Sequence, residues 1–368
     1  MEGKSTNSLG RSYVAQSVIE WETAEKEDNG KAITRLTSTV NQESKMCFTI
    51  NLTKGTPSSL PAHNLLAAVD KTCCFHTDKG LRLPLGIYNT SVARVCEKLI
   101  TFCSKFEKFI RISSIHGEYE ERIGLQRELI DYMELAIYAA AEHVDDLVAI
   151  AEGFFKDNIT FKKDANVKRL KDDIQDVKAF ISATANAIKH QQARMRLYSL
   201  EFSHARIDSV LYGFFVEEVK DGVIGPKSML DKPPSVFSIS TLAWEIILFL
   251  LLCSDLLKRF LLSCASFCNE AVGQTSDLLA QAVILAARLP LFTFEEEHPF
   301  SRATFVLTSS GGSVKQELDS GLYGSFVSRW SLSGDVRFGK SSASFMGEGS
   351  TIVFKLPLPS KVSLQHWY

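Results

Sequence analysis

The chain has 368 residues, of which 45% are hydrophobic and 23% are charged. These fractions are typical of a globular protein and exclude a collagen-like, disordered or coiled-coil interpretation of the whole chain. The 41 Lys and Arg residues nearly balance the 43 Asp and Glu residues, so the formal net charge is −2. A broadly basic nucleic-acid-binding protein is therefore excluded, although a local basic surface is not.

The first part of the chain has the composition of short strands and loops. Residues 1–11 are polar, and we expect a mobile tail there. Apolar and polar residues alternate over 46–52, which is the period of a half-buried strand. Pro and Gly residues recur over 54–87 and predict a loop. We therefore expect a β-rich N-terminal region with a loop over 12–88.

From about residue 89 the apolar residues recur every three or four positions, which is the period of an amphipathic helix. The first apolar stripe comprises Leu129, Met133, Ala136, Ala140, Val144, Leu147 and Ala151. A second stripe comprises Leu170, Ile174, Val177, Ile181, Thr184 and Ile188. These stripes predict a helical domain over 89–290.

Strand-forming residues interrupt the helical pattern near 195–225, where Val, Phe and Tyr are frequent and a turn signal follows. We expect a β-hairpin insertion there. The Ser-, Gly- and Thr-rich stretch over 291–368 predicts a β-rich C-terminal region. The expected fold class is α+β: a predominantly helical central bundle with a β-hairpin insertion, flanked by small β-rich N- and C-terminal regions that pack together.

The most apolar run, 246–252, predicts an internal helix at about 240–270 rather than a membrane span. Glu245 and Asp255 close the run well before the roughly 20 apolar residues that a spanning helix needs. We expect no membrane association. The start of the chain lacks the apolar core of a secretory signal, so the eight cysteines predict reduced thiols in a cytoplasmic protein.

Two groups of metal-binding residue types occur in the chain. Cys73, Cys74 and His76 bring three soft ligands together, but a structural zinc site requires a second pair, which is missing. His143 and Asp146 lie on adjacent helical turns without a third ligand, and we expect a solvated helix face there. The sequence therefore predicts no metal and no cofactor.

A polar set near residue 190 carries the candidate catalytic chemistry. Asn186, His190 and Arg194 are spaced by four, so on one continuous helix they line a single face, and Lys189 adds an ammonium group. The imidazole could take the proton of an RNA 2′-hydroxyl while the cations stabilise the phosphorane, without a metal. The alternative is a polar surface stripe whose basic end complements the helix dipole.

The Asn-x-x-Lys-His element at 186–190, on a late helix of a helical bundle, resembles divergent members of the HEPN superfamily. The resemblance implies a helical protein of a toxin–antitoxin or phage-defence system, many of which are metal-independent ribonucleases. The usual motif of that family is Arg, four to six residues and His, often with a polar residue directly after the Arg. Asn186 matches the polar position and His190 matches the His, but Ala185 stands where Arg is expected.

The same element also resembles the asparagine box of histidine-kinase-type ATPases, in which the Asn ligates magnesium. Residues 347–357 resemble the closing strand of that domain, and 221–225 approximate its Asp-x-Gly-x-Gly box. No Gly-x-Gly box follows, so the backbone amides that would bind the phosphates are missing. This alternative is a degenerate ATP-binding domain.

The first functional hypothesis is a HEPN-like RNA-acting effector, a metal-independent endoribonuclease of a bacterial stress or defence system. Its catalytic residues are His190, Asn186, Lys189 and Arg194. The second is a catalytically inactive interaction or scaffold protein of the same helical fold. The expected partners are RNA and either a protein partner or a second copy of the chain.

Overall fold

The structure is a computed structural model that describes the chain in segments. The described residues are 46–51, 60–113, 119–191, 193–204, 207–220, 223–228, 236–268, 277–293, 304–308, 313–318, 332–335, 341–343, 353–354 and 361–366. The tail expected at 1–11 lies outside these residues.

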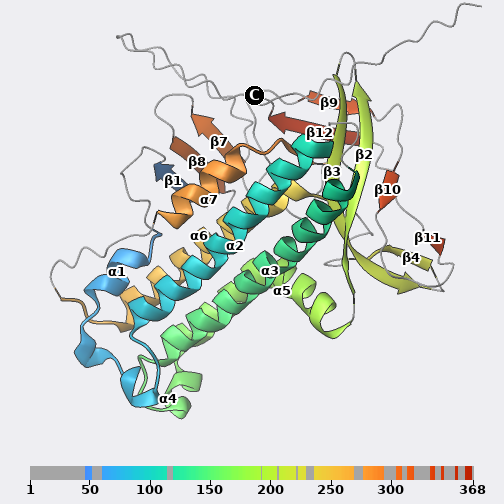
Figure 1. Ribbon diagram of the computed structural model, residues 1–368. Helices are drawn as coiled ribbons and strands as arrows, with labels where there is room; N and C mark the ends of the chain where they lie inside the picture. The colour runs from blue at the N-terminus through green and yellow to red at the C-terminus, as the bar shows by residue number, and fades with distance from the viewer. Residues whose placement is uncertain are drawn as a thin grey trace, which may run out of the picture.

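Long helices packed side by side form the centre of the molecule (Figure 1). The larger helices are α2 (Pro84–Ser113), α3 (Tyr119–Glu152), α5 (Ala165–His190), α6 (Ile239–Cys264) and α7 (Leu278–Ala287). The smaller ones are α1 (His63–Ala68), α4 (Asn158–Lys163) and the 3₁₀ turns η1 (Lys71–Cys73) and η2 (Thr77–Lys79). The predicted helical centre is confirmed.

Both predicted apolar stripes face the interior. Every stripe residue on α3, over 129–151, is buried. On α5 the buried members of the stripe are Leu170, Ile174, Ile181 and Thr184. Val177 and Ile188 are partly buried against the same core. Helix α5 therefore turns one face inward and leaves the other to solvent.

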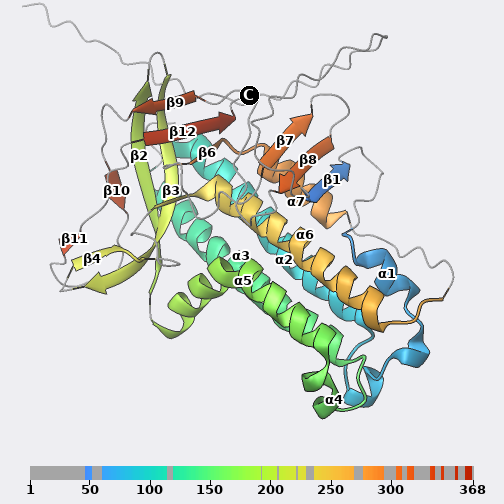
Figure 2. The same cartoon turned by 180° about the vertical axis from the view of Figure 1, so that it is seen from behind.

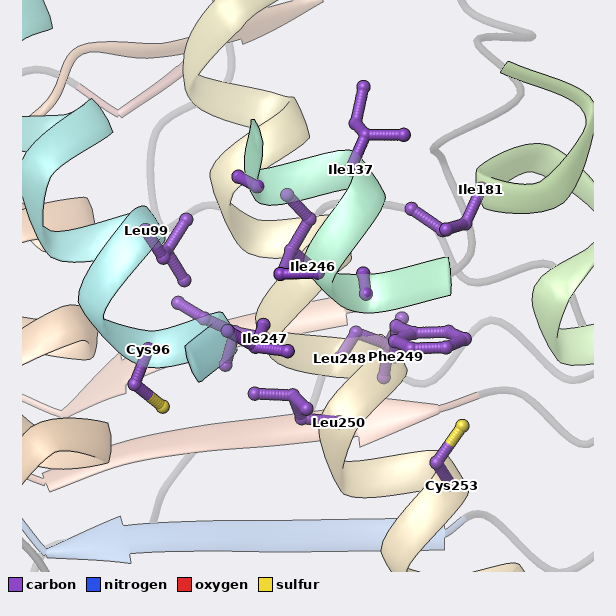
Figure 3. Close-up of a cluster of buried hydrophobic side chains, with 14 of the residues drawn as sticks. Cys96, Leu99, Ile137, Ile181, Ile246, Ile247, Leu248, Phe249, Leu250 and Cys253 are labelled. Atoms are coloured by element: carbon purple, nitrogen blue, oxygen red, sulfur yellow. The ribbon is translucent and has the colours of Figure 1, made fainter. Parts of the chain in front are cut away.

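Helix α6 is buried along most of its length and runs through the core. Every residue from Ile239 to Leu251 is buried, and the helix contacts α2, α3, α5 and α7. Figure 3 shows its side chains near Leu99 of α2, Ile137 of α3 and Ile181 of α5. The predicted internal helix is confirmed. Among the described helices, none combines the length and apolar character needed to cross a bilayer.

The predicted β-insertion is a long hairpin that follows α5 and leads into a six-stranded sheet (Figure 2). The strand order is β10–β2–β3–β4–β11, and β5 pairs with β3. The strands are β2 (Met195–His204), β3 (Ile207–Lys220), β4 (Val223–Pro226), β5 (Phe237–Ser238), β10 (Ser341–Ala343) and β11 (Val353–Phe354). The insertion is confirmed, and two strands from the C-terminal region extend its edges.

Two further three-stranded sheets, ordered β1–β8–β7 and β6–β12–β9, contain the remaining strands. These are β1 (Met46–Asn51), β6 (Leu291–Thr293), β7 (Thr304–Thr308), β8 (Ser313–Leu318), β9 (Leu332–Asp335) and β12 (Lys361–His366). Strand β1 pairs antiparallel with β8. The N- and C-terminal regions therefore share a sheet, as predicted, and the α+β class is confirmed.

The interpretation of 54–87 as a loop was wrong for much of its described part. Helix α1 and both 3₁₀ turns lie within it, and α2 already begins at Pro84. Proline is well suited to the first position of a helix, because its missing N–H needs no partner there. Helix α1 has only 6 residues, too few for a helical period to be recognised in sequence.

The burial of α6 predicts a sharp contrast between two leucines of that helix. Leu250 is 0% exposed, and its replacement by Ala should lower the free energy of unfolding by about 2–5 kcal/mol, because a cavity remains in the core. Leu262 is 58% exposed, and its replacement by Ala should change that free energy by less than about 0.5 kcal/mol. Urea denaturation followed by circular dichroism measures both. Equal effects would contradict this placement of α6.

Candidate functional site

The candidate residues lie at the end of α5 and in the short connection to β2. Helix α5 begins after Asp164, whose carboxylate caps the first turn, and it ends at His190. Asn186, Lys189 and His190 are all exposed on its last two turns. A helix carries partial negative charge at its C-terminal end, so the basic groups are stabilised there.

Arg194 does not lie on α5, and the prediction of one continuous helical face was wrong at this position. The N–H groups of Gln191 and Ala193 both donate to the Ala187 carbonyl, at 3.1 and 3.2 Å, and close the last turn. The Arg194 carbonyl then accepts a hydrogen bond of 2.9 Å from the Glu217 N–H of β3. Pairing with β3 therefore outweighs the helical spacing, while the Arg194 side chain stays exposed.

Helix α3 supplies two residues to this site that the sequence did not single out. The Lys189 Nζ lies 4.7 Å from the centroid of the Tyr138 ring, within the range of a cation–π contact. Glu134 Oε1 accepts a hydrogen bond of 3.3 Å from the Met195 N–H. Burial raises the pKa of Glu134, while the Met195 N–H and the Arg194 charge lower it in part.

The sheet adds a further cation at the end of α5. Lys227, which follows β4, donates to Gln191 Oε1 at 2.6 Å and lies 4.0 Å from Glu218 Oε1. Arg196 behaves differently, because it is buried and its Nε lies 2.7 Å from Glu217 Oε2. This buried pair links β2 to β3 and is closed to a ligand from solvent. Nothing in the sequence spacing points to Lys227.

We refer to Asn186, Lys189, His190, Arg194 and Lys227 as the α5-end face. It offers an amide, an imidazole, two ammonium groups and a guanidinium on adjoining segments of the chain. These are donors and cations suited to phosphate oxygens. The structure therefore brings the predicted site residues into one region, although not onto one helix.

His143 is fully buried, so the expectation of a solvated helix face for His143 and Asp146 was wrong at His143. Its Nδ1 lies 2.8 Å from the Oγ of Ser91 on α2, and burial lowers its pKa to about 4. Ser91 is buried as well. This hydroxyl–imidazole pair has the geometry of a nucleophile and its base, but it is closed to solvent and links α2 to α3 inside the core.

The cysteine and histidine residues near 73–76 are engaged with the backbone. The Cys73 Sγ donates to the Asp70 carbonyl at 3.0 Å, and the His76 Nε2 lies 3.0 Å from the Ile150 carbonyl. Within the described ranges, no group of three or more His, Cys, Asp or Glu side chains is arranged to hold a metal ion.

Comparison with known protein families, with curated proteins and with solved structures yields no match for this chain. The ATP-binding alternative depends in part on residues 221–222 and 347–352, which lie outside the described residues.

The buried imidazole of His143 predicts a loss of stability in acid. In the unfolded chain it titrates near its ordinary value of 6.5, and in the folded chain near 4, so the unfolded state binds more protons between these values. Its contribution is complete above about pH 6.5 and decreases as the pH falls towards 4, by up to about 3 kcal/mol.

Urea denaturation at pH 7 and pH 4.5 measures this contribution. His143→Gln keeps a polar group beside Ser91 without a titrating proton, and it should narrow the difference between the two pH values. His190→Gln, at an exposed histidine, is the control and should leave the difference unchanged. If the free energy of unfolding falls between pH 7 and pH 4.5 by the same amount in His143→Gln as in the natural chain, the buried, neutral imidazole is contradicted.

Proposed function

We propose that the chain acts on RNA through the α5-end face, as a metal-independent endoribonuclease of a bacterial stress or defence system. The observation that carries the proposal is the exposed imidazole, amide and two cations at the end of α5 and in the connection that follows, with the partly buried Lys227 beside them. A phosphate backbone supplies complementary charge, and an imidazole is the side chain that most often acts as a general acid or base.

In this proposal His190 transfers the proton. The 2′-hydroxyl of RNA loses its proton to the imidazole and attacks the adjacent phosphorus, and the bond from phosphorus to the 5′-oxygen breaks. The leaving 5′-oxygen takes a proton from the His190 imidazolium, which regenerates the neutral imidazole, so the products are a 2′,3′-cyclic phosphate and a 5′-hydroxyl. Lys189 and Arg194 stabilise the negative charge that develops on the phosphorane, and Asn186 orients the phosphate.

The resemblance to the HEPN superfamily supports this proposal through the helical bundle and through the positions of Asn186 and His190 on a late helix. One feature departs from that pattern. Ala185 stands where the family has Arg. Its side chain is a buried methyl group without charge, and it contributes nothing to the α5-end face. In this chain Arg194 is the residue that supplies the guanidinium.

A second candidate function, binding of RNA or a protein partner without cleavage, is favoured by the buried Ala185 and by the contact of Lys189 with Tyr138. A lysine held over a ring contributes charge and position but has less freedom to follow a reacting phosphate. Binding and cleavage must therefore be measured separately.

The test is replacement of His190 by Ala, with both binding and cleavage of a labelled single-stranded RNA measured. We expect cleavage to fall by about 10²–10⁴-fold, because proton transfer depends on the imidazole. The melting temperature should not change, because His190 is exposed. Arg194→Ala should weaken RNA binding. It should also make the slope of log affinity against log salt concentration shallower by about one, because one counterion fewer is released.

Lys168→Ala is the matched control, because Lys168 is an exposed cation at the other end of α5. It should leave binding and cleavage unchanged. RNA binding without cleavage in the natural chain would favour the second candidate. Cleavage that survives in His190→Ala would overturn the catalytic role of His190.

A further inference from the structure

The connection from α5 to β2 is attached to α3 through the carboxylate of Glu134. Its Oε1 accepts the hydrogen bond of the Met195 N–H, at 3.3 Å, where β2 begins. Met195 is only 1% exposed, so its N–H would be cut off from solvent if the carboxylate were absent. Arg194 is the residue directly before this bond.

Glu134 lies among charged groups, some of which oppose and some of which favour its ionised form. Burial raises the pKa of Glu134, and the negative charges of Asp131 on its own helix and Glu217 on β3 raise it further. The Met195 N–H and the positive charge of Arg194 act in the opposite direction. Burial and the acidic neighbours therefore disfavour the ionised carboxylate, and its contacts with the Met195 N–H and the Arg194 charge favour it.

We propose that Glu134 is a positioning residue of the α5-end face, which fixes the backbone at Met195 and thereby sets Arg194 beside the end of α5. The inference rests on the proposed function, because the position of Arg194 matters only if this face binds phosphate. Glu134 itself has two opposing effects. Its acceptor oxygen orders the connection, while its negative charge reduces the attraction of Arg194 for a phosphate.

Two substitutions separate these effects. Glu134→Gln removes the charge and keeps an acceptor oxygen, whereas Glu134→Ala removes both. In fluorescence anisotropy with a labelled single-stranded RNA at low salt, Glu134→Gln should bind at least as tightly as the natural chain. Glu134→Ala should bind about 5-fold or more weakly than Glu134→Gln, the size expected for one net hydrogen bond. Equal binding by the two variants would overturn the proposal.

Glu142→Ala is the matched control for the loss of a negative charge from α3. Glu142 is exposed, pairs with Arg94 of α2 at 2.7 Å and lies two turns further along the helix, about 12 Å from Glu134. It should leave RNA binding unchanged. Circular dichroism and melting temperature establish that each variant is folded.

A double-mutant comparison separates positioning from general destabilisation. If Glu134 acts through Arg194, Glu134→Ala should cause no further loss of binding once Arg194 has been replaced by Ala. Fully additive losses would overturn the proposal.

Amide hydrogen exchange at Met195 distinguishes this proposal from the proposed function. If the natural chain binds no RNA, the proposed function is overturned. Faster exchange in Glu134→Ala than in Glu134→Gln would still support the role of Glu134 in ordering the connection. Equal exchange in the two variants would overturn that role as well.

Discussion

The structure depends on the burial of the first half of α6, which is buried on all sides from Ile239 to Leu251. A helical segment that is apolar on every side must be covered all round, and α6 packs against α2, α3, α5 and α7. Each of these helices gives one face to the core and keeps the other for solvent. The exposed face of α5 is a consequence of this arrangement, because its apolar stripe is used against α6 and α3.

The same packing determines where the candidate site can form. Helix α5 ends beside α3, and the chain then enters a hairpin that is held by the buried pair of Arg196 and Glu217. The polar residues at this junction are presented by three segments: the last turns of α5, the connection to β2 and the segment after β4. Asn186, Lys189 and His190 lie on a helix, whereas Arg194 and Lys227 lie in connections next to strands.

The sequence predicted those features that depend on local periodicity. The α3 and α5 stripes followed from spacing, the hairpin from its strand-forming residues and turn signal, and the internal helix from its continuous apolar run. His143 was misjudged because it was weighed only as a metal ligand, although it lies three residues after Ala140 and four before Leu147, on the buried side. Arg194 was misjudged because helical spacing continues past the point where strand pairing takes over. The contacts of Glu134 and Lys227 join separate elements, and no spacing within one element reveals them.

Hydrogen–deuterium exchange of the full chain, with and without single-stranded RNA at low salt, tests the central claim that the end of α5 is the functional surface. The account predicts slower exchange on RNA addition at the end of α5 and the start of β2. It also predicts that the buried amides of α6 exchange slowly in both conditions. Protection by RNA confined to other surfaces, or no change at the end of α5, would contradict it.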